Sequence, residues 1–323
     1  MLDIVVETLG RICYRLPSIP TTAQIEVTNV CNLDCKMCPR EQLDITYEHI
    51  PFERMKAVVD RLQGIKSLIL AGWGEPFLHP HIFEMIRYAK QKGFYVSITT
   101  NGIFKKDSII DEIVGSGLDS LSFSIDSLSN GLKWGHPSNA VLERVKQVLQ
   151  ARKNKTPMVT LQSTLQKGGE EQVKDVIQFC YDVGADRVNL GRLDTRLIPG
   201  LDRPGPDEEM MILKEADKLG MQLGVQVDSI QYAISTGHSK TIYKLIKRLL
   251  HQMGRYCLRT YDYIYINHKG EVTPCCVLPN YSIGNILEAE LASIWKSPSF
   301  QGFRKNQKKI CGKCDQWQIE YTS

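Results

Sequence analysis

One unit recurs along most of this chain: a short run rich in β-branched residues, a turn, and a segment with helical periodicity. The strands expected from this pattern are 23–30, 67–72, 95–102, 120–126, 158–165 and 187–193. The helices expected between them lie near 51–63, 80–92, 107–116, 138–153 and 170–183. Strands that alternate with helices run parallel and are joined by right-handed crossovers. The sequence therefore predicts an α/β fold whose parallel sheet is buried on both faces.

Polar and glycine-rich residues gather where these expected strands end. They are Asn29 and Cys31, Gly72 to Glu75, Thr100 to Gly102, Ser124 and Asp126, Gln162 and Ser163, and Arg192 and Asp194. The carboxyl ends of parallel strands meet at one edge, which is where ligands bind in α/β folds. We therefore expect the functional site at this edge.

Composition narrows the classes of protein to consider. The 323 residues suffice for one large domain with an appendix, and 42% hydrophobic with 24% charged residues is ordinary for a globular protein. A net charge of +4 gives no reason to expect a nucleic-acid partner. No apolar run approaches the roughly 18–20 residues of a membrane span, and Asp3 and Glu7 stand where a secretory signal would be cationic. We expect a cytoplasmic protein without a membrane span.

The ten cysteines cluster at the two ends of the chain. In a reducing cytosol such clusters indicate metal ligands or redox centres rather than disulfides. Cys13 and Cys180 stand alone on apparently helical segments, so we expect them to be small buried apolar residues without a function.

The first cysteines form the N-terminal array, Cys31, Cys35 and Cys38, in a C-x3-C-x2-C spacing directly after the first expected strand. Three thiolates on one loop can hold three irons of a four-iron cluster and leave the fourth iron open to a small molecule. Structural zinc is the alternative. It requires four ligands, and no fourth thiol or histidine lies near this loop in sequence, so we prefer the iron–sulfur cluster.

The N-terminal array, together with GWGEP at 72–76, TTNG at 99–102 and SFSID at 122–126, resembles the radical S-adenosylmethionine (SAM) superfamily over roughly residues 20 to 200. The resemblance implies a partial (β/α)6 TIM-like barrel and a [4Fe-4S] cluster on Cys31, Cys35 and Cys38 whose open iron binds SAM. Reductive cleavage would then yield a 5′-deoxyadenosyl radical that abstracts a substrate hydrogen, with a reductant such as flavodoxin or ferredoxin as electron source.

These motifs, together with Gln162 at the end of the fifth expected strand, contain the residues expected to bind SAM. Gly72 and Gly74 let the backbone approach a ligand, and Glu75 offers an acceptor to its ammonium group. Each residue could equally serve as a turn residue or a cap. The full set is Met37, near the adenine where family members often carry an aromatic residue, Gly72, Gly74, Glu75, Thr100, Asn101, Ser124 and Gln162.

The remaining cysteines lie in the tail. The tail set, Cys257, Cys275, Cys311 and Cys314, supplies four thiolates, which suit a closed [4Fe-4S] cluster or, as the serious alternative, zinc. Its opening resembles the SPASM extension of the superfamily in the truncated, one-cluster form called twitch. Cys276 is left over: it is inert, alternates with Cys275, or supplies a hydrogen atom to a substrate radical.

The tail also carries structural signals. After the Pro/Gly-rich connector IPGLDRPGPDEE we expect one more helix and strand, an amphipathic helix around 240–253, a hairpin around Lys269 and Gly270, and a helix near 287–305. The tail contains too little apolar sequence for a robust core of its own, so a metal staple is expected. The expected domains are an N-terminal helical extension (1–22), the radical SAM partial barrel (23–235) and the auxiliary iron–sulfur extension (236–323).

The preferred activity is oxidation of a small polyol or sugar-like molecule, with the tail cluster as electron acceptor. Candidate substrate-binding or catalytic residues are Asp126, Arg192, Asp194 and Cys276, with Arg196, Tyr261 and Asp262 as further possibilities. Arg192 and Asp194 could instead simply pair with each other. The alternatives are a redox-neutral epimerase or dehydratase, a ribosomal-peptide maturase, and a non-enzymatic module with two zinc sites. The short segment before the first strand speaks against a built-in leader-binding module.

Overall fold

The computed structural model describes residues 18–103, 108–126, 128, 138–195, 198, 200–229, 257–312 and 314. A ten-stranded sheet organises this part of the chain, in the order β10-β9-β8-β1-β2-β3-β4-β5-β6-β7. Its parallel strands are β1 (Thr22–Ile25), β2 (Ser67–Leu70), β3 (Tyr95–Thr100), β4 (Ser120–Ser124), β5 (Met158–Leu165), β6 (Arg187–Arg192), β7 (Gln226–Asp228) and β8 (Tyr263–Ile266). Antiparallel β9 (Glu271–Thr273) and β10 (Gly284–Asn285) extend the sheet beyond β8.

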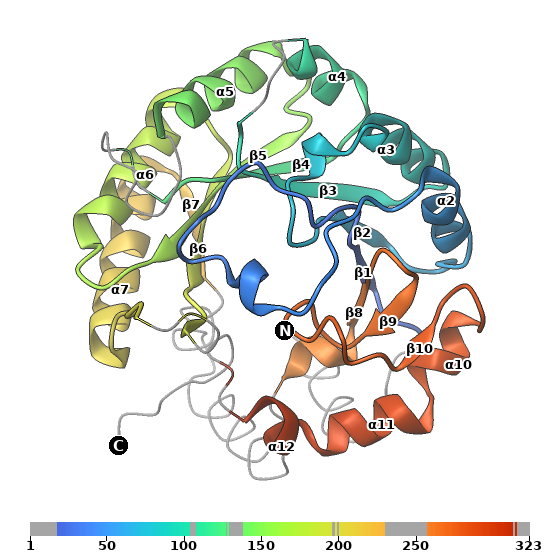
Figure 1. Ribbon diagram of the computed structural model, residues 1–323. Coiled ribbons are helices and arrows are strands. Elements are labelled where there is room, and N and C mark those ends of the chain that lie inside the picture. Colours follow the sequence, from blue (N-terminus) through green and yellow to red (C-terminus); the bar gives the residue numbers. More distant parts are fainter. Residues whose placement is uncertain are drawn as a thin grey trace.

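Helices form the outer layer around these strands, as Figure 1 shows. They are α2 (Phe52–Asp60), α3 (Ile82–Gln91), α4 (Ile109–Gly115), α5 (Ser138–Ala151), α6 (Glu170–Val183) and α7 (Pro206–Leu223). The tail adds α10 (Leu291–Trp295), α11 (Pro298–Lys305) and α12 (Gln307–Cys311). Short 3-10 turns lie at η1 (Pro39–Gln42), η2 (Pro76–Leu78) and η4 (Leu258–Tyr261). The predicted α/β class and partial barrel are confirmed.

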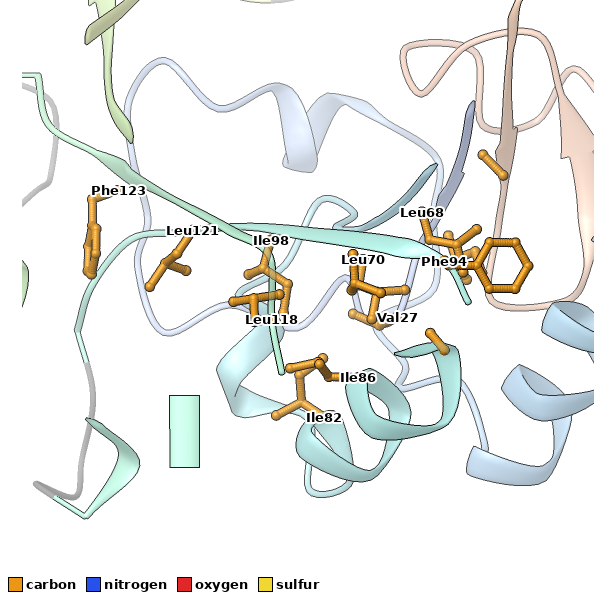
Figure 2. Packing of buried hydrophobic residues seen from close by; sticks show 14 of the residues in the cluster. Val27, Leu68, Leu70, Ile82, Ile86, Phe94, Ile98, Leu118, Leu121 and Phe123 are labelled. Atoms are coloured by element: carbon orange, nitrogen blue, oxygen red, sulfur yellow. The ribbon is translucent and has the colours of Figure 1, made fainter. Parts of the chain in front are cut away.

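The core lies between the sheet and this helical layer. Alternate residues of each strand point outward, so Leu68 and Leu70 of β2 pack near Ile82 and Ile86 of α3, all almost fully buried (Figure 2). Burying one such side chain contributes about 1.5–3 kcal/mol. The inward-facing residues are more polar, which leaves the interior of the barrel available for a site.

The expected strands and helices are present, with shifted ends. The strand 158–165 and the helix 170–183 have the predicted bounds. The helix ends at Val183 because Gly184 adopts the left-handed conformation, at φ 71°. The first strand is shorter than predicted, ending at Ile25 rather than residue 30. The chain leaves the ladder there because residues 26–30 build the loop that leads to the N-terminal array.

The tail shares the core of the barrel. Strand β8 pairs with β1, and Trp295, Phe300 and Phe303 belong to the same group of buried residues as the barrel core. The hairpin around Lys269 and Gly270 is confirmed, with β8 antiparallel to β9. The single helix predicted near 287–305 is wrong, because Pro298 starts a new helix, capped by the Ser297 hydroxyl that accepts from the Phe300 N–H at 3.1 Å.

Some predictions fall outside the described residues: Cys13 with the first 17 positions, Arg196, and the amphipathic helix around 240–253. The boundary predicted at 235 and 236 lies there too, so the division into domains stays a prediction. None of the helices in the described ranges has the length and apolar character needed to cross a membrane.

Candidate functional site

A cavity of about 460 Å³ opens on the inner side of the barrel. Loops after several strands reach it: Gly72 and Gly74 after β2, Ser124 at the end of β4, and Asp194 after β6. The whole N-terminal array and every tail cysteine line it, namely Cys31, Cys35, Cys38, Cys257, Cys275, Cys276, Cys311 and Cys314. Cysteines more than 200 positions apart in sequence thus face one space.

The N-terminal array lies on the loop between β1 and η1. The Cys38 N–H donates to the Cys35 carbonyl at 2.9 Å, which folds the loop so that the three side chains face the cavity. The pKa of Cys35 is raised to about 12, mainly by burial and also by the neighbouring Cys38 and Cys31 thiols. Thiols that repel one another as anions are stabilised as thiolates by a cation. The donor set therefore fits the three-thiolate side of an iron–sulfur cluster.

Asn101 holds this array in place. Its Nδ2 donates to Asn32 Oδ1 at 2.8 Å and lies 3.8 Å from Cys31 Sγ, and its Oδ1 accepts from the Ile103 N–H at 2.8 Å. The sequence predicted that Asn101 binds SAM. The side chain does line the cavity, but these contacts make it a support of the cysteine loop.

Glu75 joins two of the motifs. Its buried carboxylate accepts from the Phe77 N–H at 3.1 Å, the Thr100 hydroxyl at 2.8 Å and the Asn101 N–H at 2.7 Å. Burial raises the pKa of this carboxyl to about 7 against the effect of the three hydrogen bonds. The predicted contact with an ammonium group stays a prediction, because the contacts present tie GWGEP to TTNG.

Two of the predicted SAM-binding residues do not line the cavity. Thr100 is turned into the protein, where its hydroxyl also accepts from the Gly102 N–H at 3.0 Å, and the preceding Thr99 lines the cavity instead. Successive strand side chains point to opposite faces, which accounts for the displacement by one residue. Gln162 lies two residues before Thr164 on the same face of β5, and only Thr164 of the two lines the cavity. Met37 and Ser124 line it as expected.

Gly72 and Gly74 pack against the chain that leaves β1. A Cβ on Gly74 would lie 2.3 Å from the Val30 carbonyl oxygen, and one on Gly72 would lie 2.4 Å from Glu26 Cγ. The missing side chains therefore permit close approach of two backbone segments, in addition to any approach to a ligand. Trp73, between them, was not singled out from the sequence, although it lines the cavity and donates from Nε1 to the Cys276 carbonyl at 3.0 Å.

The predicted catalytic residues divide into two groups. Arg192, Asp194 and Cys276 line the cavity, whereas Asp126 does not. Asp126 is buried, accepts from the Thr164 N–H at 3.2 Å, and its charge contributes to the raised pKa of Cys35.

Arg192 is engaged by a partner that the sequence did not indicate. Its Nε donates to Glu209 Oε1 at 2.7 Å and its Nη2 to Glu209 Oε2, with both side chains buried. These contacts join β6 to α7, and the pairing of Arg192 with Asp194 stays a prediction. Tyr261 and Asp262 do not line the cavity.

The tail set is drawn together from three segments. Burial raises the pKa of Cys257, and so do the nearby Cys275 and Cys314 thiols. Gln307 of α12 accepts from the Cys257 N–H at 2.8 Å and donates to Thr260 Oγ1 at 2.6 Å, which fixes the loop that carries Cys257. Four thiols that line one cavity are a donor set that suits an iron–sulfur cluster.

Cys276 differs from its neighbours. The hydrogen bond from Cys275 is the main cause that lowers its pKa to about 7, and the Arg259 guanidinium also lowers it. Arg259 stacks on the Tyr263 ring, with Cζ 3.9 Å from the ring centroid.

Among the described residues, no three His, Cys, Asp or Glu side chains converge closely enough to enclose a single metal ion.

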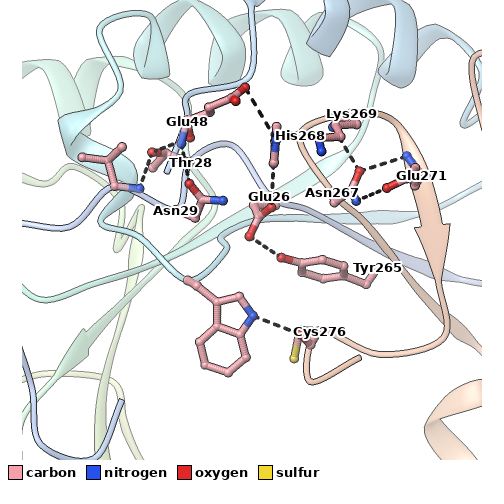
Figure 3. A network of polar contacts seen from close by, with 12 residues as sticks. Glu26, Thr28, Asn29, Glu48, Tyr265, Asn267, His268, Lys269, Glu271 and Cys276 are labelled. Atoms are coloured by element: carbon pink, nitrogen blue, oxygen red, sulfur yellow. Dashed lines mark hydrogen bonds and ion pairs between the residues drawn. The ribbon is translucent and has the colours of Figure 1, made fainter. Parts of the chain in front are cut away.

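A buried polar network attaches the tail to the barrel (Figure 3). Glu26, only 1% exposed, accepts from the Tyr265 hydroxyl at 2.7 Å, and its other oxygen lies 3.2 Å from His268 Nδ1. His268 Nε2 lies 3.7 Å from Glu48 Oε2. Because β8 and its hairpin carry these residues, the network fixes the segment that presents Cys275 and Cys276 to the cavity.

Comparison with known proteins agrees with this geometry. A family model described as the radical SAM superfamily matches residues 25–180, and the SPASM model, described as an iron–sulfur cluster-binding domain, matches residues 257–315. The chain is 24% identical over 299 residues to the tungsten-containing aldehyde ferredoxin oxidoreductase cofactor-modifying protein of Pyrococcus furiosus, covering 87% of this chain and 82% of that protein. It is 22% identical over 317 residues to the AdoMet-dependent heme synthase of Methanosarcina barkeri, covering 93% and 88%.

Among solved structures, SuiB of Streptococcus suis bound to S-adenosylmethionine has the same fold, with a TM-score of 0.74 at 16% identity over 98% of this chain and 76% of that one. SuiB bound to its precursor peptide SuiA gives a TM-score of 0.73 at 16% identity, over 98% and 75%. The chain belongs to the radical SAM superfamily, is an enzyme with a SPASM domain at its C-terminal end, and uses S-adenosylmethionine, a SAM-binding [4Fe-4S] cluster and auxiliary iron–sulfur chemistry.

Proposed function

We propose that this enzyme is an oxidoreductase in which both cysteine sets serve one reaction space. The observation that carries the proposal is that the N-terminal array and the tail set line the same cavity. When bound, the first cluster and SAM supply a 5′-deoxyadenosyl radical that removes a hydrogen atom from the substrate. The tail set would hold the auxiliary cluster, which would supply an acceptor for the electron left on the substrate.

The chain's own residues divide the remaining work. Cys31, Cys35 and Cys38 hold the first cluster, and Asn101 and Glu75 keep the surrounding loops in register. Met37, Thr99 and Ser124 line the part of the cavity that SAM would occupy.

Substrate binding falls to the other wall of the cavity. Asp194 is the carboxylate there that we propose as the base for a substrate proton, and Arg259 supplies positive charge near the tail set. Arg192, engaged by Glu209, serves to position α7 against this wall. The polyol or sugar-like substrate stays a hypothesis, since the names of the relatives reported above do not point to one.

Metal analysis and single-cysteine variants test the proposal. After anaerobic reconstitution, Cys31→Ala should lose the iron and sulfide of the first cluster and stop SAM cleavage by dithionite. Cys275→Ala should lose the tail iron yet still cleave SAM. Cys180→Ala, which removes a buried thiol of α6 that does not line the cavity, is the matched control and should keep both. Zinc without sulfide in the tail would contradict the proposal.

Peptide maturation is the second candidate, favoured by the fold shared with SuiB, which has been solved with its precursor peptide. The product separates the candidates: oxidation of a small hydroxylated molecule gives a carbonyl, whereas a maturase modifies a peptide. The redox-neutral alternative is recognised by deuterium that enters the target carbon from deuterium oxide. Mass spectrometry of the product distinguishes all three.

A further inference from the structure

The end of the tail is strongly basic. Residues 291–314 contain six lysines and arginines and no aspartate or glutamate. The whole chain carries only +4, so the rest of it has a slightly negative net charge, although residues 229–261 also contain six lysines and arginines and no acidic residue. Such an asymmetry produces a local field that can steer a partner of opposite charge.

The basic side chains divide between the core and the solvent. Arg304 is buried, with Nε and Nη1 donating to backbone carbonyls of Thr260 and Trp295 at 3.0 and 2.9 Å. Lys305, Lys308 and Lys309 are exposed. Within the described ranges, none of these three lysines forms an ion pair, so their charge faces the solvent uncompensated. We call these three residues the lysine face.

The opposite side of the same helices faces the cavity. Phe303 of α11 and Cys311 of α12 line it, and Gln307 anchors the Cys257 loop. Figure 1 shows α11 and α12 at the outer rim of the tail. Since one helix with its side chains is roughly 10–12 Å across, only that thickness of protein separates the lysine face from the tail set.

We propose that the lysine face is the docking surface for a small acidic flavin protein that exchanges single electrons with the tail set. The proposal rests on the proposed function, because it requires an iron–sulfur cluster on these cysteines. One electron leaves the reduced carrier and reduces the tail cluster by one electron, and no atom or proton is transferred. In the opposite direction, the oxidised form of the same carrier would accept the one electron that the tail cluster has taken from the substrate. Electron-transfer encounters use small, transient interfaces in which complementary charge steers the approach of the partner.

Charge reversal on the lysine face tests the proposal. The reconstituted full-length enzyme is mixed with flavodoxin hydroquinone, and cluster reduction is followed by stopped-flow absorbance. Lys305→Glu/Lys308→Glu/Lys309→Glu should lower the second-order rate constant at least tenfold at low ionic strength. This deficit should shrink as salt screens the charges. Reduction by dithionite should be unchanged, which shows that the clusters are intact.

The matched control changes the net charge equally elsewhere. Lys153, Lys214 and Lys218 are exposed, and Lys153→Glu/Lys214→Glu/Lys218→Glu should slow flavodoxin much less. Equal slowing in both triple variants, or no slowing in the first, would overturn the proposal. Cys275→Ala separates the two levels of inference. It should lose part of the dithionite-reducible absorbance if the tail holds a cluster, and an unchanged amplitude would locate the failure in the proposed function instead.

Discussion

Gly74→Ala is the sharpest test of how the GWGEP loop supports the N-terminal array. The added Cβ would lie 2.3 Å from the Val30 carbonyl oxygen and 2.7 Å from the backbone carbon of Asn29. Favourable contacts lie at about 3.5–4.0 Å between carbons and only slightly closer to oxygen, so one of the two backbone segments must move by about 1 Å. Overpacking of this kind costs about 1–3 kcal/mol. Because Val30 immediately precedes Cys31, the same movement displaces the first ligand of the array.

Two measurements therefore change together in Gly74→Ala. The midpoint of urea unfolding should fall, and iron in the first cluster should decrease after reconstitution while the tail iron is retained. Gly115→Ala is the control. A Cβ at this position, the exposed end of α4, would meet no atom within 4 Å, and alanine is a better helix former than glycine. It should raise stability by up to about 1 kcal/mol. A Gly74→Ala protein with the wild-type midpoint and full iron would refute the reasoning.

Three further predictions follow from the buried contacts. Asn101→Ala removes a donor to the first sulfur of the array and should lower the midpoint potential of that cluster by an amount on the order of tens of millivolts, measured by an EPR-monitored titration. Burial raises the pKa of Glu75 from 4.5 to about 7, so the folded chain binds the extra proton and stability falls as pH rises through this window, by up to about 3 kcal/mol. Glu75→Gln should abolish this part of the pH dependence of urea unfolding. If the plots of stability against pH were parallel for the wild type and Glu75→Gln, the assignment to Glu75 would be contradicted. Tyr265→Phe leaves Oε1 of the buried Glu26 without its hydroxyl donor and should cost about 1–3 kcal/mol in the same assay, whereas Tyr88→Phe, which removes an exposed hydroxyl, should cost much less.

Local chemistry made much of the fold predictable. Helix α6 could be delimited because Gly184 supplies the left-handed residue that ends a helix, and the hairpin could be placed because Gly270 adopts φ 84°. The helix near 287–305 was mispredicted where apolar periodicity continued through Pro298, whose missing N–H interrupts the backbone ladder. Strand ends were placed too far along the chain, because polar residues after β1 continue the pattern without continuing the hydrogen bonds.

The site was predictable where it depends on spacing and not where it depends on pairing. Cys31, Cys35 and Cys38 are close in sequence, so their common direction follows from one loop. The Arg192 and Glu209 pair joins β6 to α7, and nothing near either residue in sequence announces it. Similarly, the choice between Thr99 and Thr100 at the cavity wall depends on the phase of the strand, which is settled only by its neighbours in the sheet.

The position of the tail set depends on the register between β1 and β8. Tyr263 pairs with Thr22 and Tyr265 with Gln24, which places both tyrosine hydroxyls on the inner face. There the Tyr263 hydroxyl donates to Gln24 Oε1 at 2.6 Å, and the Tyr265 hydroxyl donates to Glu26. A slip by one residue would turn both tyrosines to the apolar outer face and leave their buried hydroxyls without acceptors. The buried polar contacts therefore select one register, and that register determines that the segment after the hairpin delivers its cysteines to the cavity of the N-terminal array.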